Sequence, residues 1–107
     1  GFRCCALRGA VYPGLVPETR AVARGVLWGG LDERTLARID RFEGELYERR
    51  SVAVEREVEA ACEAFVYVLG PAGRGVAEAA PWDEAEFRAR HLAAYLRGCR
   101  AFARQNP

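Results

Sequence analysis

The chain has 107 residues, of which 50% are hydrophobic and 29% are charged, a composition typical of one folded domain rather than of a disordered chain. Its 16 basic residues are all arginines and are interleaved with 15 acidic residues, and the net charge of +1 argues against nucleic-acid binding. No apolar stretch approaches about 18 residues and no signal-peptide pattern opens the chain, so we expect a cytoplasmic protein that does not bind membranes.

The first third of the chain predicts two strands. Residues 2–11 are apolar and are interrupted by arginines, and Tyr12-Pro13-Gly14 then ends the element. Residues 21–28 alternate loosely between apolar and polar side chains, which predicts the second strand. Gly25 inside this strand indicates a bulge or a close approach of two backbones.

The best-marked helix of the sequence is predicted over residues 33–43. Asp32 can accept hydrogen bonds from the free N–H groups of the first turn, and Gly44 stands where a helix-ending glycine belongs. One buried stripe is expected along this helix, formed by Leu36, Ile39 and Phe42. Glu43 is therefore expected to be the last helical residue before the chain turns, at the rim of the core.

The second half of the chain predicts an antiparallel strand pair and a long helix. Residues 47–54 have the two-residue period of a strand, and residues 61–69 are nearly continuously apolar, as in a central strand covered on both faces. Residues 70–81 are rich in Gly, Ala and Pro and are expected to form a loop. Asp83 then caps the last helix, which the apolar spacing extends without a break to about residue 104.

The common arrangements for nucleophilic and metal catalysis find little support in the sequence. Ser51 and His91 are the only serine and histidine, nothing places them together, and we interpret His91 as a packed side chain of the last helix. No cysteine pair has the spacing of a zinc site, and we interpret all four cysteines as reduced core thiols. We therefore predict neither a metal nor a cofactor.

Glu43 differs from the other acidic residues of the chain. It closes the predicted helix beside Phe42, where it faces the negative end of the helix dipole. That position and partial burial would both raise its pKa toward neutrality, which suits a carboxyl group that accepts a proton and later returns it. The same pattern also fits a solvated side chain before a helix-ending glycine, and the spacing alone leaves both interpretations open.

Several segments together resemble the gamma-glutamylcyclotransferase-like proteins, including their avirulence-induced-gene-like branch. The signature D-x-F-E-G…Y-x-R…V-x-V is matched by Asp40-Arg41-Phe42-Glu43-Gly44, Tyr47, Arg49 and Val52-Ala53-Val54. Further segments are similar to strands of that family, namely Tyr12 to Val16, Val22 to Trp28 and Ala64 to Val68. The resemblance covers roughly residues 9–69. It implies a small mixed α+β fold with a mostly antiparallel, curved or barrel-like sheet, a short helix after the second strand and a longer C-terminal helix.

The resemblance also implies a cofactor-free enzyme that cleaves gamma-glutamyl amides. The substrate's own α-amine attacks its γ-carbonyl, and the products are 5-oxoproline and a free amine or amino acid. The acid/base of the family is the glutamate of the F-E-G motif, which here is Glu43. The candidates for substrate binding are Tyr12, Pro13, Gly14 and Tyr47, although a simple turn and the packing of a strand aromatic also explain these residues.

Two features depart from the pattern of the family. Its early strand carries a Y-G-(S/T)-L motif whose loop amides hold the glutamyl group, and nothing in residues 1–11 matches that motif. The chain also begins without methionine. We therefore expect residues 1–107 to be a single domain that lacks an N-terminal piece, with an unpaired strand edge that would allow a homodimer. A non-catalytic module that binds a small ligand or another protein on the same fold is the alternative.

Overall fold

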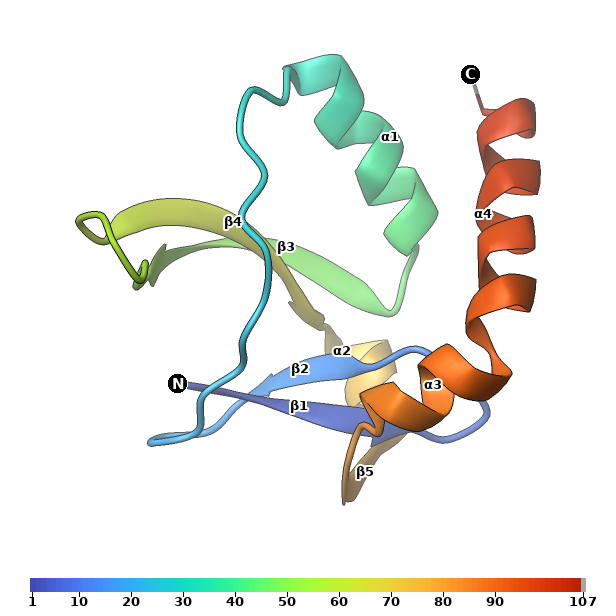
Figure 1. Ribbon diagram of the computed structural model, residues 1–107, viewed down its shortest axis with the longest axis horizontal. Coiled ribbons are helices and arrows are strands. Elements are labelled where there is room, and N and C mark those ends of the chain that lie inside the picture. The colour runs from blue at the N-terminus through green and yellow to red at the C-terminus, as the bar shows by residue number, and fades with distance from the viewer. Residues whose placement is uncertain (107) are drawn as a thin grey trace.

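The computed structural model describes residues 1–106, whose strands form two antiparallel sheets (Figure 1). One sheet has three strands in the order β2-β1-β5, and the other pairs β3 with β4. The strands are β1 Phe2–Leu7, β2 Gly14–Pro17, β3 Tyr47–Val54, β4 Cys62–Leu69 and β5 Ala77–Pro81. The helices are α1 Glu33–Glu43, α2 Pro71–Arg74, α3 Glu84–Arg90 and α4 Leu92–Gln105. This arrangement confirms the predicted mixed α+β class with mostly antiparallel strands.

The core is small and lies where the three-stranded sheet meets the end of β4. β1 is the central strand, because Cys5 is in register with Gly14 of β2 on one side and with Pro81 of β5 on the other. The buried cluster consists of Cys5, Leu7 and Leu69. Since the hydrophobic effect scales with the apolar area removed from water, a core of this size makes each contact of Leu69 important for stability.

Gly14 is a point of close approach between the two sheets. A Cβ atom at this position would lie 2.6 Å from Cδ1 of Leu69, well inside the ordinary carbon–carbon contact distance of about 3.5–4.0 Å. Gly14 itself is buried and is the first residue of β2. The missing side chain therefore lets β2 contact β4, and the segment Tyr12-Pro13-Gly14, which was predicted to end the first strand, leads directly into a second one.

The predicted antiparallel pair is confirmed, with Tyr47 of β3 opposite Leu69 of β4. The prediction that β4 is a central strand covered on both faces is wrong. Within the described residues β4 is paired only with β3, and Phe65 in its middle is 58% exposed. The hairpin projects away from the three-stranded sheet (Figure 1), so only its near end, at Val68 and Leu69, reaches the core.

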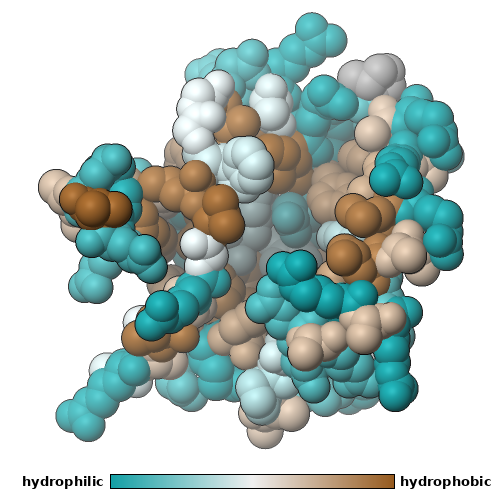
Figure 2. Space-filling view, in the orientation of Figure 1, coloured by the Kyte–Doolittle hydropathy of each residue, from teal (hydrophilic) through white to brown (hydrophobic). Residues whose placement is uncertain are grey.

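The strand predicted over residues 21–28 does not form. This segment has no regular secondary structure, and Val22, Val26 and Trp28 are 77–79% exposed. A strand needs partners for its backbone N–H and C=O groups, and no strand among residues 1–106 pairs with this segment. Gly25 marks neither a bulge nor a close approach, because a Cβ atom there would meet nothing within 4 Å. Hydrophobic side chains are consequently exposed at the surface, both on the β3–β4 hairpin and on residues 21–28 (Figure 2).

Helix α1 has the predicted bounds and the predicted caps. Oδ1 of Asp32 accepts a hydrogen bond from the backbone N–H of Thr35 at 2.8 Å, and this bond lowers the pKa of Asp32. Gly44 ends the helix with a φ of 75°, which favours glycine, and donates to the carbonyl of Asp40 at 3.1 Å. The expected stripe is only partly buried, since no residue of α1 is fully buried and Phe42 packs edge-on against Phe102 of α4.

The predicted last helix is broken into two. His91 separates α3 from α4 with a φ of −122°, outside the helical range, and α4 turns toward α1 (Figure 1). In a straight helix, Phe87 and Tyr95 would be about 12 Å apart along the axis. Their ring centroids are 5.5 Å apart. His91 is therefore a half-buried residue at the break, and the expectation that it packs along one continuous apolar stripe is wrong.

The predicted loop over residues 70–81 contains α2 and β5 instead. β5 is composed of Ala, Glu and Pro, which have little preference for strands, and it forms by pairing with β1. The four cysteines are free as expected, but only Cys5 is fully buried. No helix within residues 1–106 has the length and apolarity needed to cross a lipid bilayer.

Candidate active site

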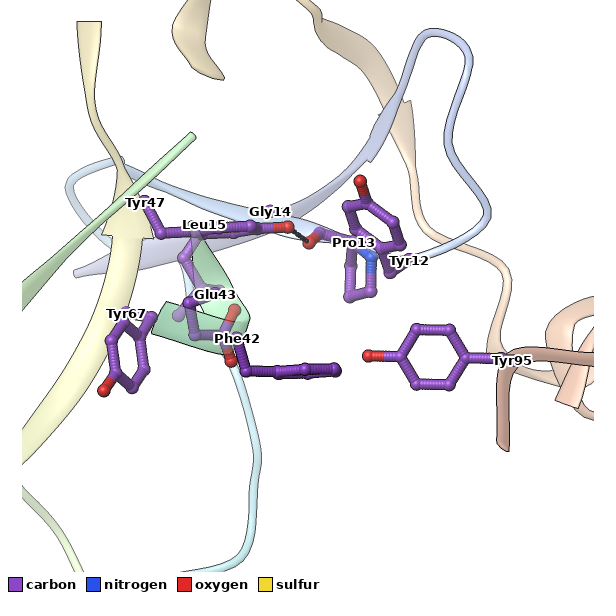
Figure 3. Close-up of a pocket in the computed structure, with 9 residues that line it drawn as sticks. All are labelled: Tyr12, Pro13, Gly14, Leu15, Phe42, Glu43, Tyr47, Tyr67 and Tyr95. Carbon is purple, nitrogen blue, oxygen red and sulfur yellow. Dashed lines mark hydrogen bonds between the residues drawn. The ribbon is translucent and has the colours of Figure 1, made fainter. Parts of the chain in front are cut away.

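A cavity of about 370 Å³ opens where α1 ends, bordered by residues of the two sheets and of α4 (Figure 3). Its lining consists of Tyr12, Pro13, Gly14, Leu15, Phe42, Glu43, Tyr47, Tyr67 and Tyr95. All of the site residues predicted from the sequence line this cavity. Glu43 comes from α1, Gly14 from β2 and Tyr47 from β3, and Tyr12 and Pro13 come from the connection between β1 and β2. The volume is at the lower end of the range for pockets that hold small molecules.

Glu43 is the last residue of α1, is half-buried, and lies at the wall of this cavity. Burial raises the pKa of Glu43 above its ordinary value of 4.5. The negative end of the α1 dipole acts in the same direction, because it disfavours a second negative charge at the helix C-terminus. A carboxyl group with a raised pKa can exchange a proton more readily near neutral pH than a solvated one.

Tyr47 connects the start of β3 to the segment that precedes β2. Its hydroxyl group donates a hydrogen bond of 2.6 Å to the carbonyl oxygen of Pro13, and its ring centroid lies 6.5 Å from that of Tyr12. Burial, followed by the negative charge of Glu43, raises the pKa of Tyr47. The hydroxyl group therefore remains protonated and holds the backbone of Pro13 at the edge of the cavity.

A second network holds the end of α1 against the hairpin. The hydroxyl group of Tyr67 donates to Oδ1 of Asp40 at 2.5 Å, and Nε of Arg49 lies 3.4 Å from the same oxygen. Burial and the bond to Asp40 raise the pKa of Tyr67. Asp40 lies nearly one helical turn before Glu43, so both residues face the same side of α1. The network thereby fixes where the carboxyl group of Glu43 sits relative to β4.

Tyr95 is the contribution of α4 to the cavity. Its hydroxyl end points from the helix toward Phe42 (Figure 3), and its ring centroid lies 6.3 Å from that of Tyr12. Burial, then the neighbouring Cys99 and Glu43, raise the pKa of Tyr95 to about 12. The phenol is therefore neutral at physiological pH.

Four lining residues were missed by sequence reasoning, namely Leu15, Phe42, Tyr67 and Tyr95. Phe42 and Tyr95 lie at helical spacing within apolar stripes, where an aromatic residue of the core has the same pattern. The hydroxyl group of Tyr95, a polar group within an apolar stripe, is the one sequence signal that could have indicated a residue lining a cavity. Tyr67 and Leu15 lie within strand-like segments and carry no comparable signal.

The lining of the cavity contains one charged side chain, Glu43, and its remaining members are aromatic or apolar residues and a glycine. An ammonium group is attracted to a carboxylate in such partly dry surroundings more strongly than in water. Within residues 1–106, no group of three or more His, Cys, Asp or Glu side chains is placed so that it could hold a metal ion.

Comparisons with known proteins match this chain to one family. A family model described as "Gamma-glutamyl cyclotransferase, AIG2-like" matches residues 1–88. AIG2-like protein A of Arabidopsis thaliana is 35% identical over 57 residues, which are 53% of this chain and 34% of that protein, so the match spans about a third of the relative's length. No solved structure matches the chain. Because the family model covers most of its residues, the chain belongs to the AIG2-like gamma-glutamyl cyclotransferase family.

Proposed function

We propose that this protein cleaves gamma-glutamyl amides by cyclisation, with Glu43 as the group that accepts and returns the proton. One observation carries the proposal: the carboxyl group of Glu43 is half-buried at the wall of a 370 Å³ cavity and has a raised pKa. Had this side chain pointed into open solvent, the reaction would have no acid/base. Membership of the family supports the class of reaction.

The reaction begins with a proton transfer to Glu43. The α-amine of the substrate is an ammonium ion in water, and the ionised carboxylate removes one of its protons. The free electron pair on the nitrogen then forms a bond to the γ-carbonyl carbon, and the carbonyl oxygen takes up negative charge. The five-membered ring closes without a nucleophile from the protein, which fits a cavity whose lining contains no serine, cysteine or histidine.

The second half of the reaction returns the proton. When the carbonyl re-forms, the bond between the γ-carbon and the departing nitrogen breaks, and that nitrogen takes the proton that Glu43 holds. The ring nitrogen loses its remaining extra proton, which the released amine takes up in water. The products are 5-oxoproline and an ammonium ion, so charge and atoms balance and no water is consumed.

The other predicted site residues are proposed to bind the substrate and hold it folded. The Tyr47 hydroxyl group fixes the Pro13 carbonyl, and with it the segment from Tyr12 to Gly14 that borders the cavity. A substrate held in the ring-closing conformation gains the rate advantage of an intramolecular reaction. Walls made of aromatic rings favour such a compact conformation over an extended chain in contact with water.

The test is to measure release of 5-oxoproline from gamma-glutamyl dipeptides, gamma-glutamyl-lysine and glutathione. The protein is used in the longest form that its gene encodes, and the product is quantified by mass spectrometry. Glu43→Gln keeps the shape of the side chain but cannot accept the proton, and should lower kcat by about 10²–10⁴-fold. Glu45→Gln is the matched control, because Glu45 is exposed and does not line the cavity.

Turnover that survives Glu43→Gln would overturn the assignment of the acid/base. Equal losses in the Glu43 and Glu45 variants would also count against it. If the protein binds these compounds and never releases 5-oxoproline, a non-catalytic ligand-binding module describes it better than an enzyme does.

A further inference from the structure

Tyr95 differs from the other residues of the cavity in its origin. Most of the lining comes from the chain between Tyr12 and Tyr67, which lies within the matched range of residues 1–88. Tyr95 comes from α4, beyond that range. The part of the wall that α4 supplies therefore lies outside the residues that the family model matches.

The break at His91 is what places Tyr95 at the cavity. It lets α4 leave the direction of α3, so that the Tyr95 ring packs on Phe87 at 5.5 Å and on Tyr12 at 6.3 Å. Phe42 and Phe102, in edge-to-face contact at 5.2 Å, hold α4 against the end of α1. The contact with Phe87 of α3 holds the Tyr95 ring directly, and the contact between α1 and α4 holds the helix that carries it. A bound ligand would have to break these contacts to displace the ring.

The chemistry of the lining indicates which part of a gamma-glutamyl amide meets this ring. The α-ammonium group is drawn to Glu43, where its proton is removed. The α-carboxylate is repelled by Glu43, whose negative charge also acts on Tyr95, so this side of the cavity disfavours a second negative charge. In a simple amide, the substituent on the amide nitrogen carries no charge, so it can contact the rings of Tyr12 and Tyr95 without losing the solvation of a charge.

We propose that Tyr95 is a specificity-determining residue that limits the size of the substituent on the amide nitrogen of the substrate. The inference rests on the proposed function, since it assigns a part of the same substrate to one wall of the same cavity. The ring acts as a barrier and the hydroxyl group is secondary. Removing the ring should therefore admit larger substituents, whereas removing only the hydroxyl group should not.

The experiment compares gamma-glutamyl methylamide with gamma-glutamyl benzylamide as substrates. Tyr95→Ala should raise the ratio of kcat/KM for the benzylamide over that for the methylamide by about tenfold or more, the effect expected when a pocket wall discriminates by size. Tyr95→Phe keeps the ring and should keep the wild-type ratio. Leu96→Ala is the matched control on the same helix, because Leu96 is 40% exposed and does not line the cavity. Its ratio should stay within about twofold of wild type.

A Tyr95→Ala ratio equal to that of the wild type, with turnover still abolished by Glu43→Gln, would overturn this inference and leave the proposed function standing. If the wild type turns over neither amide, the affinities of the two amides are measured by calorimetry instead, and the proposed function fails only if the gamma-glutamyl dipeptides are not turned over either. A preference that moves toward the benzylamide in Tyr95→Ala supports the barrier, and an unchanged preference or no binding overturns it. Should Tyr95→Ala fail to fold by circular dichroism, Tyr95→Leu provides a smaller truncation with the same expected direction.

Discussion

Replacing Gly14 by alanine would place a Cβ atom 2.6–2.8 Å from three side-chain carbons of Leu69. Ordinary carbon–carbon contacts are about 3.5–4.0 Å, so each of the three would be too short by nearly 1 Å. Leu69 is fully buried and belongs to the core cluster, and it cannot swing out into solvent to make room. Alanine at this position therefore forces β2 and β4 apart or pushes Leu69 into an unfavourable rotamer.

The expected magnitude follows from two opposing effects. Overpacking of a core typically costs about 1–3 kcal/mol. Alanine also restricts the unfolded chain, which stabilises the fold by about 0.4–1 kcal/mol. The net loss in the free energy of unfolding should be about 1–2 kcal/mol. In a domain of about 100 residues, each kcal/mol shifts the Tm by about 4–8 °C.

Urea and thermal unfolding of three variants test this expectation. Gly25→Ala is the control glycine substitution, because a Cβ there would meet nothing within 4 Å. Leu69→Ala removes the atoms that clash with the new methyl group, at a cost of about 2–5 kcal/mol by itself. The double variant Gly14→Ala/Leu69→Ala should lose less stability than the sum of the two single losses, by about 0.5–3 kcal/mol.

If the unfolding midpoints of the Gly14→Ala and Gly25→Ala variants were the same, the reasoning would be refuted, because β2 and Leu69 would then not be in contact. Additive losses in the double variant would refute it as well. Since Gly14 also lines the cavity, Gly14→Ala should in addition weaken binding of gamma-glutamyl compounds.

Two further predictions concern single polar groups of the site. Tyr47→Phe leaves the carbonyl of Pro13 without its partner and should lower the free energy of unfolding by about 1 kcal/mol; an unchanged urea midpoint would contradict this. Burial raises the pKa of Glu43, so the folded state binds this proton more tightly than the unfolded state, and the ionised group destabilises the fold once the pH exceeds its pKa. Glu43→Gln should therefore unfold at a higher temperature than wild type at pH 7, with the difference shrinking as the pH falls toward 4.5 and vanishing below it; a less stable variant at pH 7 would show that the ionised carboxylate is favourably solvated.

Local features of the sequence determined α1 and the position of Glu43 at its end. Asp32 and Gly44 act within their own helix, through a hydrogen bond to Thr35 and a turn at positive φ, so their effect does not depend on the rest of the fold. The two-residue period of β3 and the apolar run of β4 were likewise sufficient to predict an antiparallel pair. The same alternation over residues 21–28 was misleading, because a strand also requires a neighbour to pair with.

The tertiary structure decided the elements and contacts that depend on distant residues. β5 forms against β1 although its composition is unfavourable for a strand, and the chain breaks at His91 although the apolar spacing continues through it. Capping, turn geometry and side-chain period act over a few residues, and so the sequence alone determined α1, the hairpin and the carboxylate between them. The cavity, with Tyr95 as its wall on the α4 side, required the packed molecule, because it is made by side chains that only long-range contacts bring together.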